Sequence, residues 1–117
     1  MPAPTPLTIA TQSVQRLVKE ETYYRKELAD QSSRVEKLEA QLKTSAEENA
    51  EFMLKQEQKA IEETRAVFAP LRERIDEALQ RLEEQIATGE SEGASEDEIK
   101  KAKETLTLGQ SEATAAS

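Results

Sequence analysis

The sequence predicts an all-α protein, an elongated antiparallel three-helix bundle made of two long helices and a shorter third helix. Two observations predict it. Apolar residues recur at steps of seven over two long stretches, which is the spacing that lines one side of a helix in a packed seam. Good helix formers dominate the 117 residues, with only 3 glycines and 4 prolines among them.

The composition limits the kind of core that the chain can build. Hydrophobic residues make up 36% of the sequence and aromatic residues 3%, whereas typical globular chains are about 45–50% apolar. Such a chain cannot fill a thick core, but it can fill the thin seams between helices, which need few apolar residues per turn. The length suits one domain.

The first helix is expected over about residues 11–43. Residues 1–6 contain three prolines, which remove amide donors and disfavour helix, so we expect a disordered N-terminal lead there. Either Thr8 or Thr11 is placed to cap the helix. Heptad spacing then continues for about five repeats.

Two polar residues, Glu21 and Gln31, interrupt the apolar seam of this helix. A glutamate at such a position marks a gap in packing, a device that fixes the register, or a polar contact to the third helix. The residues leave these three alternatives open. Nearby, Tyr24 lies on the seam and Tyr23 lies one position further, facing outward, where its ring either anchors a partner or lies along the helix surface.

A change of register separates the first helix from the second. Leu42 and Leu54 are twelve positions apart, so a continuous helix would rotate its apolar side by roughly a third of a turn between them. Two overlapping capping boxes also begin at Thr44 and Ser45. We therefore expect a turn within residues 44–49 and not one very long helix.

The second helix is expected over about residues 50–87 and contains Pro70. A proline inside a helix removes a donor and presses on the preceding turn, at a cost of ~3 kcal/mol, so we expect a bend at Ala66–Pro70. The apolar side widens in the later half of this helix. This predicts that the first helix packs along its whole length and the third only on the later half. Thr88 and Gly89 predict its end.

The third helix is expected over residues 95–108. It follows an acidic loop at residues 90–94, and Ser95 with Glu98 forms a capping box at its start. We expect Gly109 to end it. The expected division of the chain is a lead over residues 1–6, a bundle over 7–108 and a flexible tail over 109–117.

The residue types present exclude several kinds of chemistry. The chain has no cysteine and no histidine, so thiolate metal sites, cysteine nucleophiles and histidine bases are excluded. A di-metal bundle would need Glu-x-x-His pairs, and the glycines form no phosphate-binding loop. We therefore expect no enzyme, no cofactor and no metal, and we interpret the acidic residues as solvated helix faces.

Charge and hydropathy also limit the partners. The formal net charge is −8, which argues against duplex nucleic acid and anionic membranes. No apolar run approaches the ~20 residues of a membrane span. The N-terminus lacks a basic region followed by an apolar one, so we expect no secretory signal.

Specific runs resemble a known family. Residues Gln15–Leu28, which read QRLVKEETYYRKEL, and the VEKL at 35–38 resemble the first helix of the tubulin-binding cofactor A family, and the tyrosine pair resembles its fungal branch. The second helix is similar at Leu54–Glu57 and around Pro70. Residues 99–106 match the family's short third helix more loosely.

The resemblance implies a soluble cytosolic chaperone of the microtubule cytoskeleton. It would capture β-tubulin released from the cytosolic chaperonin and pass it, without nucleotide, toward the cofactors that build the αβ dimer. It would be a monomer or a weak homodimer. The alternative function is a homo-oligomeric coiled-coil scaffold or tether, because such seams also pair between chains.

Electrostatics predict where a tubulin partner would bind. Tubulin is acidic, as this chain is, so net charge opposes the complex and the attraction must come from local basic groups and apolar contacts. Outward helix positions that carry such groups form the candidate tubulin-binding surface: Arg16, Lys19, Tyr23, Arg25, Lys26, Arg72 and Arg74.

Overall fold

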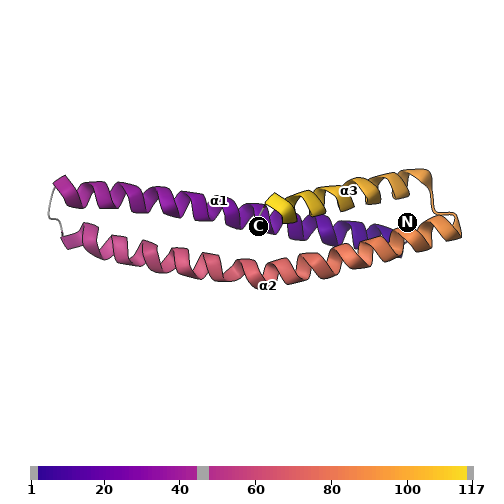
Figure 1. The fold of residues 1–117 in the computed structure, drawn as a ribbon, viewed down its shortest axis with the longest axis horizontal. Coiled ribbons are helices and arrows are strands. Elements are labelled where there is room, and N and C mark those ends of the chain that lie inside the picture. Colours follow the sequence, from indigo (N-terminus) through magenta and orange to yellow (C-terminus); the bar gives the residue numbers. More distant parts are fainter. Residues whose placement is uncertain (1–2, 45–47, 116–117) are drawn as a thin grey trace. The chain divides into compact units, whose positions relative to one another are not determined.

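The computed structural model describes residues 3–44 and 48–115 of the chain. Within them it forms three helices, α1 (Pro6–Thr44), α2 (Glu48–Glu92) and α3 (Glu96–Ala115) (Figure 1). The predicted all-α class, with two long helices and a shorter third one, is confirmed.

The contacts along the chain divide it into two compact units. The first unit comprises residues 1–20 and 71–117, and so joins the beginning of α1, the later part of α2 and all of α3. The second unit comprises Glu21–Pro70, which holds the rest of α1 and the beginning of α2. The division in α2 therefore falls directly after Pro70.

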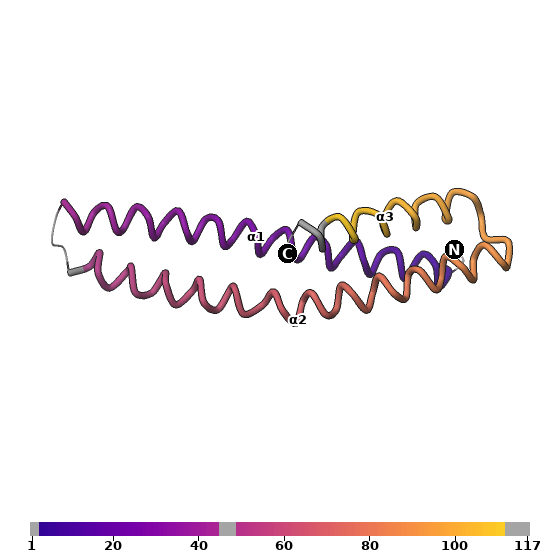
Figure 2. The backbone as a smooth tube through the Cα atoms, in the orientation of Figure 1, coloured from indigo at the N-terminus to yellow at the C-terminus, as the bar shows by residue number. Residues whose placement is uncertain are grey.

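The core of the first unit lies where its three helices meet. Figure 2 shows α3 running beside the indigo beginning of α1 and the orange end of α2. The side chains of Val14, Leu71 and Leu82 are fully buried, and burial of each large apolar side chain contributes roughly 1.5–3 kcal/mol. The other apolar residues buried in this unit are Leu7, Ala10, Leu17, Val18, Ile75, Leu79, Ile86 and Ala102.

Two glycines that we expected to end helices lie inside them. A Cβ atom added to Gly109 would lie 2.6 Å from Leu79 Cδ2 and 3.2 Å from Val14 Cγ1. A Cβ atom added to Gly89 would lie 3.1 Å from Ile99 Cδ1 and 3.2 Å from Leu7 Cδ2. The expected helix ends at these glycines are therefore wrong, because both glycines serve close packing between helices.

The start of α1 also corrects the prediction. The helix begins at Pro6, five residues before the expected start. Thr5 caps it, because the backbone N–H of Thr8 donates to Thr5 Oγ1 at 3.1 Å. Proline is favoured at the first helical position, where its missing donor costs nothing. The expected lead is thus wrong at Pro6, and the cap is Thr5 and not Thr8 or Thr11.

The end of α2 comes five residues later than expected. The helix continues to Glu92, so most of the expected acidic loop is helical. Gly93 follows with φ of 77°, and the Ala94 N–H donates to the Gly89 carbonyl at 2.8 Å. This bond and the positive φ form a Schellman cap, in which glycine avoids the strain that a Cβ atom would cause.

The ends of α3 agree with the sequence at its start and differ at its end. The Glu98 N–H donates to Ser95 Oγ at 3.2 Å, which confirms Ser95 as the cap. The Glu98 carboxylate accepts a hydrogen bond from Thr5 Oγ1 at 2.9 Å and so joins the beginnings of α3 and α1. The helix runs to Ala115, so the expected tail is wrong over residues 109–115.

The second unit consists of two helices with a thin and partly polar seam. Its buried apolar residues are Leu38, Ala50 and Ile61. The polar residues Glu21, Gln31 and Thr64 are buried in the same unit. A seam of this composition buries less apolar surface than the core of the first unit does, so it contributes less to stability.

The part of α2 in this unit begins near the expected turn and ends at Pro70. The chain changes from α1 to α2 between Thr44 and Glu48, and the expected turn lies mostly on residues 45–47, outside the described residues. α2 continues as a helix through Pro70, and the bend expected there stays a prediction.

Candidate binding surface

The seven residues predicted to bind tubulin fall in different units. Four belong to the first unit: Arg16, Lys19, Arg72 and Arg74. The other three, Tyr23, Arg25 and Lys26, belong to the second unit. The predicted surface is therefore made of two groups, each with its own surroundings.

Two of the predicted residues in the first unit line one groove. The groove has a volume of about 210 Å³ and runs between α1 and α2. We call it the arginine groove, and its lining residues are Ser13, Arg16, Leu17, Arg74, Glu77, Ala78 and Arg81. The α1 residues and the α2 residues each recur at spacings of three or four, which places each set on one helix face.

The arginine groove carries an excess of positive charge. Arg16, Arg74 and Arg81 are all exposed, and Glu77 is the one acid among the lining residues. Among the residues that the structure describes, no carboxylate lies within ion-pair distance of these three guanidinium groups. A guanidinium keeps its charge at all physiological pH values and can bind a carboxylate through two parallel hydrogen bonds.

Arg81 is the groove residue that the sequence analysis missed. It lies seven positions after Arg74 and three after Ala78, so helical spacing alone could have found it. It lies outside the runs that resemble a known family, which gave no reason to single it out. The structure adds it because the later part of α2 lies against the beginning of α1.

The other two cations of the first unit differ from the groove arginines. Lys19 is exposed on α1 and does not line the groove. Arg72 is half-buried and already takes part in an interaction within the protein. Of the four predicted residues in this unit, the structure thus brings together Arg16 and Arg74.

In the second unit, Tyr23 projects from α1 as expected. Its side chain is 62% exposed, while Tyr24 is half-buried. The two rings make an edge-to-face contact, with their centroids 5.3 Å apart and their planes at 75°. Such a contact orients an exposed aromatic ring without burying it. Lys26 is also exposed on this helix.

Arg25 has a structural partner that the sequence analysis did not assign. Its guanidinium pairs with the carboxylate of Glu21 one turn earlier, and the Glu21 side chain is 1% exposed. The buried polar position in the seam thus holds a charge that is paired along its own helix. Because its guanidinium is already paired and partly buried, Arg25 is less available to bind a partner than an exposed arginine is.

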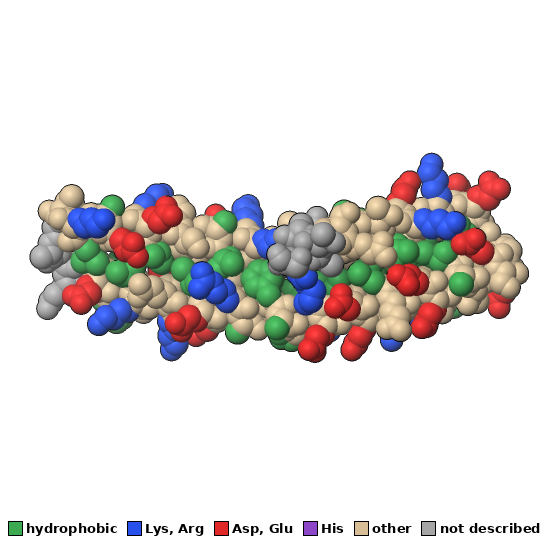
Figure 3. All heavy atoms as spheres, in the orientation of Figure 1, with side chains coloured by type: hydrophobic (Ala, Val, Ile, Leu, Met, Phe, Trp, Pro, Cys, Tyr) green, Lys and Arg blue, Asp and Glu red, His purple; other side chains and the backbone are tan. Residues whose placement is uncertain are grey.

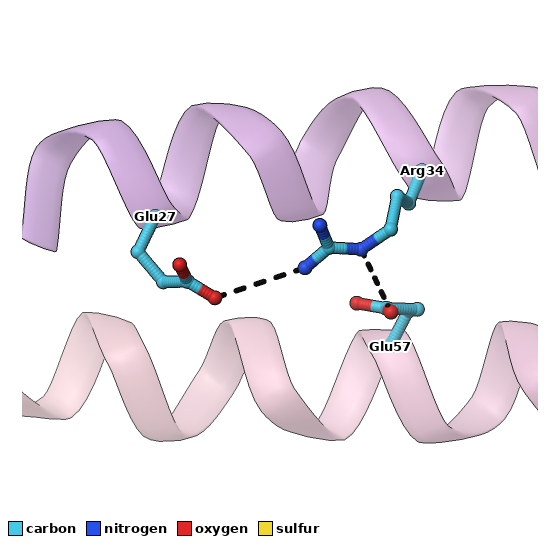
Figure 4. A network of polar contacts seen from close by, with 3 residues as sticks. All are labelled: Glu27, Arg34 and Glu57. Carbon is cyan, nitrogen blue, oxygen red and sulfur yellow. Dashed lines mark hydrogen bonds and ion pairs between the residues drawn. The ribbon is translucent and has the colours of Figure 1, made fainter.

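A second charged group joins the two helices of this unit. Arg34 of α1 donates from Nε to Glu57 Oε1 of α2 at 2.9 Å, and its Nη2 lies 3.7 Å from Glu27 Oε1 (Figure 4). Exposed ion pairs contribute about 0.2–1 kcal/mol each. This triad therefore helps to align α1 and α2, and nothing in its geometry indicates chemistry.

Hollows beside α3 in the first unit combine charges of both signs, whereas the hollow next to Gly93 carries only the acids Glu92 and Glu98. One of about 550 Å³ lies beside α3, where Lys103 pairs with Glu90 at 3.3 Å. Figure 3 likewise shows acidic and basic side chains intermixed along the helices of the visible face. The described residues include no acid cluster that could hold a metal ion. None of the helices over residues 3–44 and 48–115 is long and apolar enough to cross a membrane.

Together, the packed helices and the open, cation-lined groove define a helical binding protein. Comparison with known proteins identifies the family. The family model described as tubulin binding cofactor A matches residues 2–106, and the chain belongs to this family. The tubulin-specific chaperone A of Saccharomyces cerevisiae is 34% identical over 86 residues, which cover 74% of this chain and 76% of that protein. No solved structure matches the chain.

Proposed function

We propose that the protein is a tubulin-folding chaperone. It captures β-tubulin folding intermediates after their release from the cytosolic chaperonin, holds them and passes them toward assembly of the αβ dimer, without nucleotide. The observation that carries this proposal is the family match over residues 2–106. The name of the yeast relative, a tubulin-specific chaperone, supports the same role.

The structure supports a mechanism of binding without catalysis. The candidate residues lie on helix surfaces. The groove between α1 and α2 is open, and its charged lining residues are three arginines and one glutamate. A client held by exposed cations and an exposed aromatic ring can be released when a later cofactor competes for it, because no covalent bond forms. The protein would act in the cytoplasm, with microtubule assembly as its context, as a monomer or weak homodimer.

The proposed capture can be tested by recovery of tubulin from a cell lysate. The full chain with an affinity tag should recover β-tubulin without stoichiometric α-tubulin. An unrelated acidic helical protein with the same tag serves as the control. Recovery of α- and β-tubulin in equal amounts, or of neither, would contradict the proposed function.

The cations of α1 can be tested in the same assay. Charge reversal at two exposed residues, Arg16→Glu with Lys19→Glu, should reduce the recovery of β-tubulin because it replaces attraction by repulsion. The control reverses Lys55 and Lys59, which are also exposed. Arg25 is left unchanged because its loss would also disturb buried Glu21. Equal recovery by both variants would show that the α1 cations do not contact the client.

A further inference from the structure

The arginine groove lies on the part of the first unit that α3 does not line. α3 contacts the other two helices through a Gln15–Thr105 hydrogen bond of 3.4 Å and the close packing of Gly109. A Gln110–Glu83 hydrogen bond of 3.4 Å adds to these contacts. The lining of the groove, in contrast, comes from α1 and α2 alone. The groove is thus a helix–helix junction left open within this unit.

The charge of the groove is opposite to that of the protein as a whole. Three guanidinium groups and one carboxylate line it, while the chain carries a formal net charge of −8. Exposed arginines without a carboxylate of their own keep their bidentate donors available. The chemical group that fits them is a carboxylate supplied by another molecule.

The size of the groove indicates how much of a partner it can take. Its volume is about 210 Å³, below the roughly 300–1,000 Å³ of typical small-molecule sites. Its floor includes Leu17, which is buried, and Ala78, which is half-buried. Such a space holds a few side chains of a peptide segment laid across it, and not a whole helix or a cofactor.

An exposed apolar residue extends this surface along α1. Ile9 is 55% exposed. It lies four positions before Ser13 and seven before Arg16, so the three residues share one helix face. Seven residues of helix span about 10.5 Å, which an extended chain covers in about three residues.

We propose that the arginine groove binds an extended acidic segment of the folding client. Carboxylate side chains of this segment pair with Arg16, Arg74 and Arg81, and an apolar side chain about three residues away packs on Ile9. Attraction between two acidic proteins is thereby confined to one place where the local charges are complementary. The identity of the client rests on the proposed function, whereas the preference for an acidic segment rests on the groove.

A binding experiment with a defined peptide tests the groove directly. The probe is a fluorescein-labelled synthetic peptide that carries several glutamates and one leucine three positions away, and the control peptide has glutamine in place of every glutamate. Fluorescence anisotropy measures their binding to the full chain. Binding of the acidic peptide should exceed that of the control peptide and weaken with added salt.

Matched variants then locate the site. Arg74→Gln with Arg81→Gln should weaken binding of the acidic peptide at least about tenfold, because two charge-assisted contacts are lost. Lys55→Gln with Lys59→Gln removes the same charge from two exposed positions outside the groove and should leave binding unchanged. All four positions are exposed, so circular dichroism should show the same helicity for both variants. Equal weakening in both, or in neither, would overturn the proposal.

Recovery of β-tubulin by the same proteins separates this proposal from the proposed function. If the unchanged chain recovers no β-tubulin but binds the peptide through the groove, the chaperone function fails and the acidic-segment site stands. If the groove variant recovers β-tubulin as well as the lysine variant does, the client does not use the groove, and that part of the proposal is overturned. If the groove variant loses both β-tubulin recovery and peptide binding while the lysine variant keeps both, the proposed binding of the client in the groove is supported.

Discussion

Gly109 determines how closely α3 can lie against its neighbours in the first unit. A Cβ atom at this position would lie 2.6 Å from Leu79 Cδ2, which is shorter than real contacts allow, and Val14 stands 3.2 Å away. Both neighbours are buried, so neither has free space into which to move. A residue that costs about 1 kcal/mol in a helix relative to alanine is used here because the helices pack so closely.

Replacement of Gly109 by leucine should therefore destabilise the protein. The expected loss is about 1–3 kcal/mol in the free energy of unfolding, which is typical of overpacked cores. The measurement is urea denaturation followed by circular dichroism. The control is Leu108→Ala at the adjacent position, which is 47% exposed and should change stability by less than about 0.5 kcal/mol. Similar midpoints for the two variants would show that α3 does not pack closely at Gly109.

Buried Glu21 illustrates a different effect at the residue scale. Its position in the apolar seam left three interpretations open, and the structure shows a carboxylate paired with Arg25 along the same helix. A buried charge is tolerated only where such a partner compensates for lost hydration. The pairing also makes Arg25 less available for binding a partner. Helical spacing does not show this, because it depends on burial and contacts in the folded protein.

At the scale of the helices, Gly93 ends α2 where Gly89 does not. Gly93 has φ of 77°, a conformation that costs residues with a Cβ atom about 1–2 kcal/mol. No atom lies within 4 Å of a Cβ added there, so the backbone conformation alone sets the penalty.

Substitution of Gly93 should follow this backbone preference. Gly93→Ala should lower the free energy of unfolding by about 1 kcal/mol, and Gly93→Asn should lower it less, because asparagine tolerates the left-handed conformation. Thermal unfolding of the two variants and the parent chain measures the order. An alanine variant as stable as the parent would contradict a left-handed cap.

Pro70 is the other residue whose effect belongs to a whole helix. α2 continues through it, although a proline in a helix interior removes one backbone hydrogen bond and costs ~3 kcal/mol or more. Its ring is exposed, so burial of the ring offsets little of that cost.

Pro70→Ala should accordingly stabilise the protein, by up to about 3 kcal/mol. Urea denaturation of the variant and the parent chain provides the measurement, with Ala69→Ser at the preceding exposed position as a control for surface substitution. A less stable Pro70→Ala variant would show that the helix depends on the proline. Recovery of β-tubulin by the same variant tests whether the expected bend matters for capture.

At the scale of the whole molecule, the question is whether the seams pair within or between chains. In each unit, the buried apolar residues are covered by helices of the same chain. A coiled-coil scaffold would instead bury such residues against a second copy. The structure therefore favours the chaperone proposal over the homo-oligomeric alternative.

We expect sedimentation equilibrium to give the mass of a monomer, with at most weak self-association. Exposed apolar side chains remain at Phe52 and Met53, which are 61% and 48% exposed, and such residues can support weak pairing. The control is Phe52→Ser, which should remove any such association. A stable dimer that persists on dilution and binds no β-tubulin would favour the scaffold.

The sequence alone determined the helical class, the order of the three helices, the capping residue of α3 and the absence of cysteine and histidine. These properties depend on residue types and on spacing along the chain, which are local. The resemblance of residues Gln15–Leu28 to a known family was also sufficient to identify that family, which the match over residues 2–106 confirms.

Only the tertiary structure decided the remaining features, because each depends on which neighbours a residue meets. Gly89 and Gly109 look like helix ends in the sequence, but they are points of close packing between helices. Arg16 of α1 comes together in one groove with Arg74 and Arg81 of α2, far away in the chain, and Ile9 remains exposed on the same helix as Arg16. Local spacing predicts the face on which a residue lies, but the packing of α1, α2 and α3 within the first unit decides whether that face is covered or open.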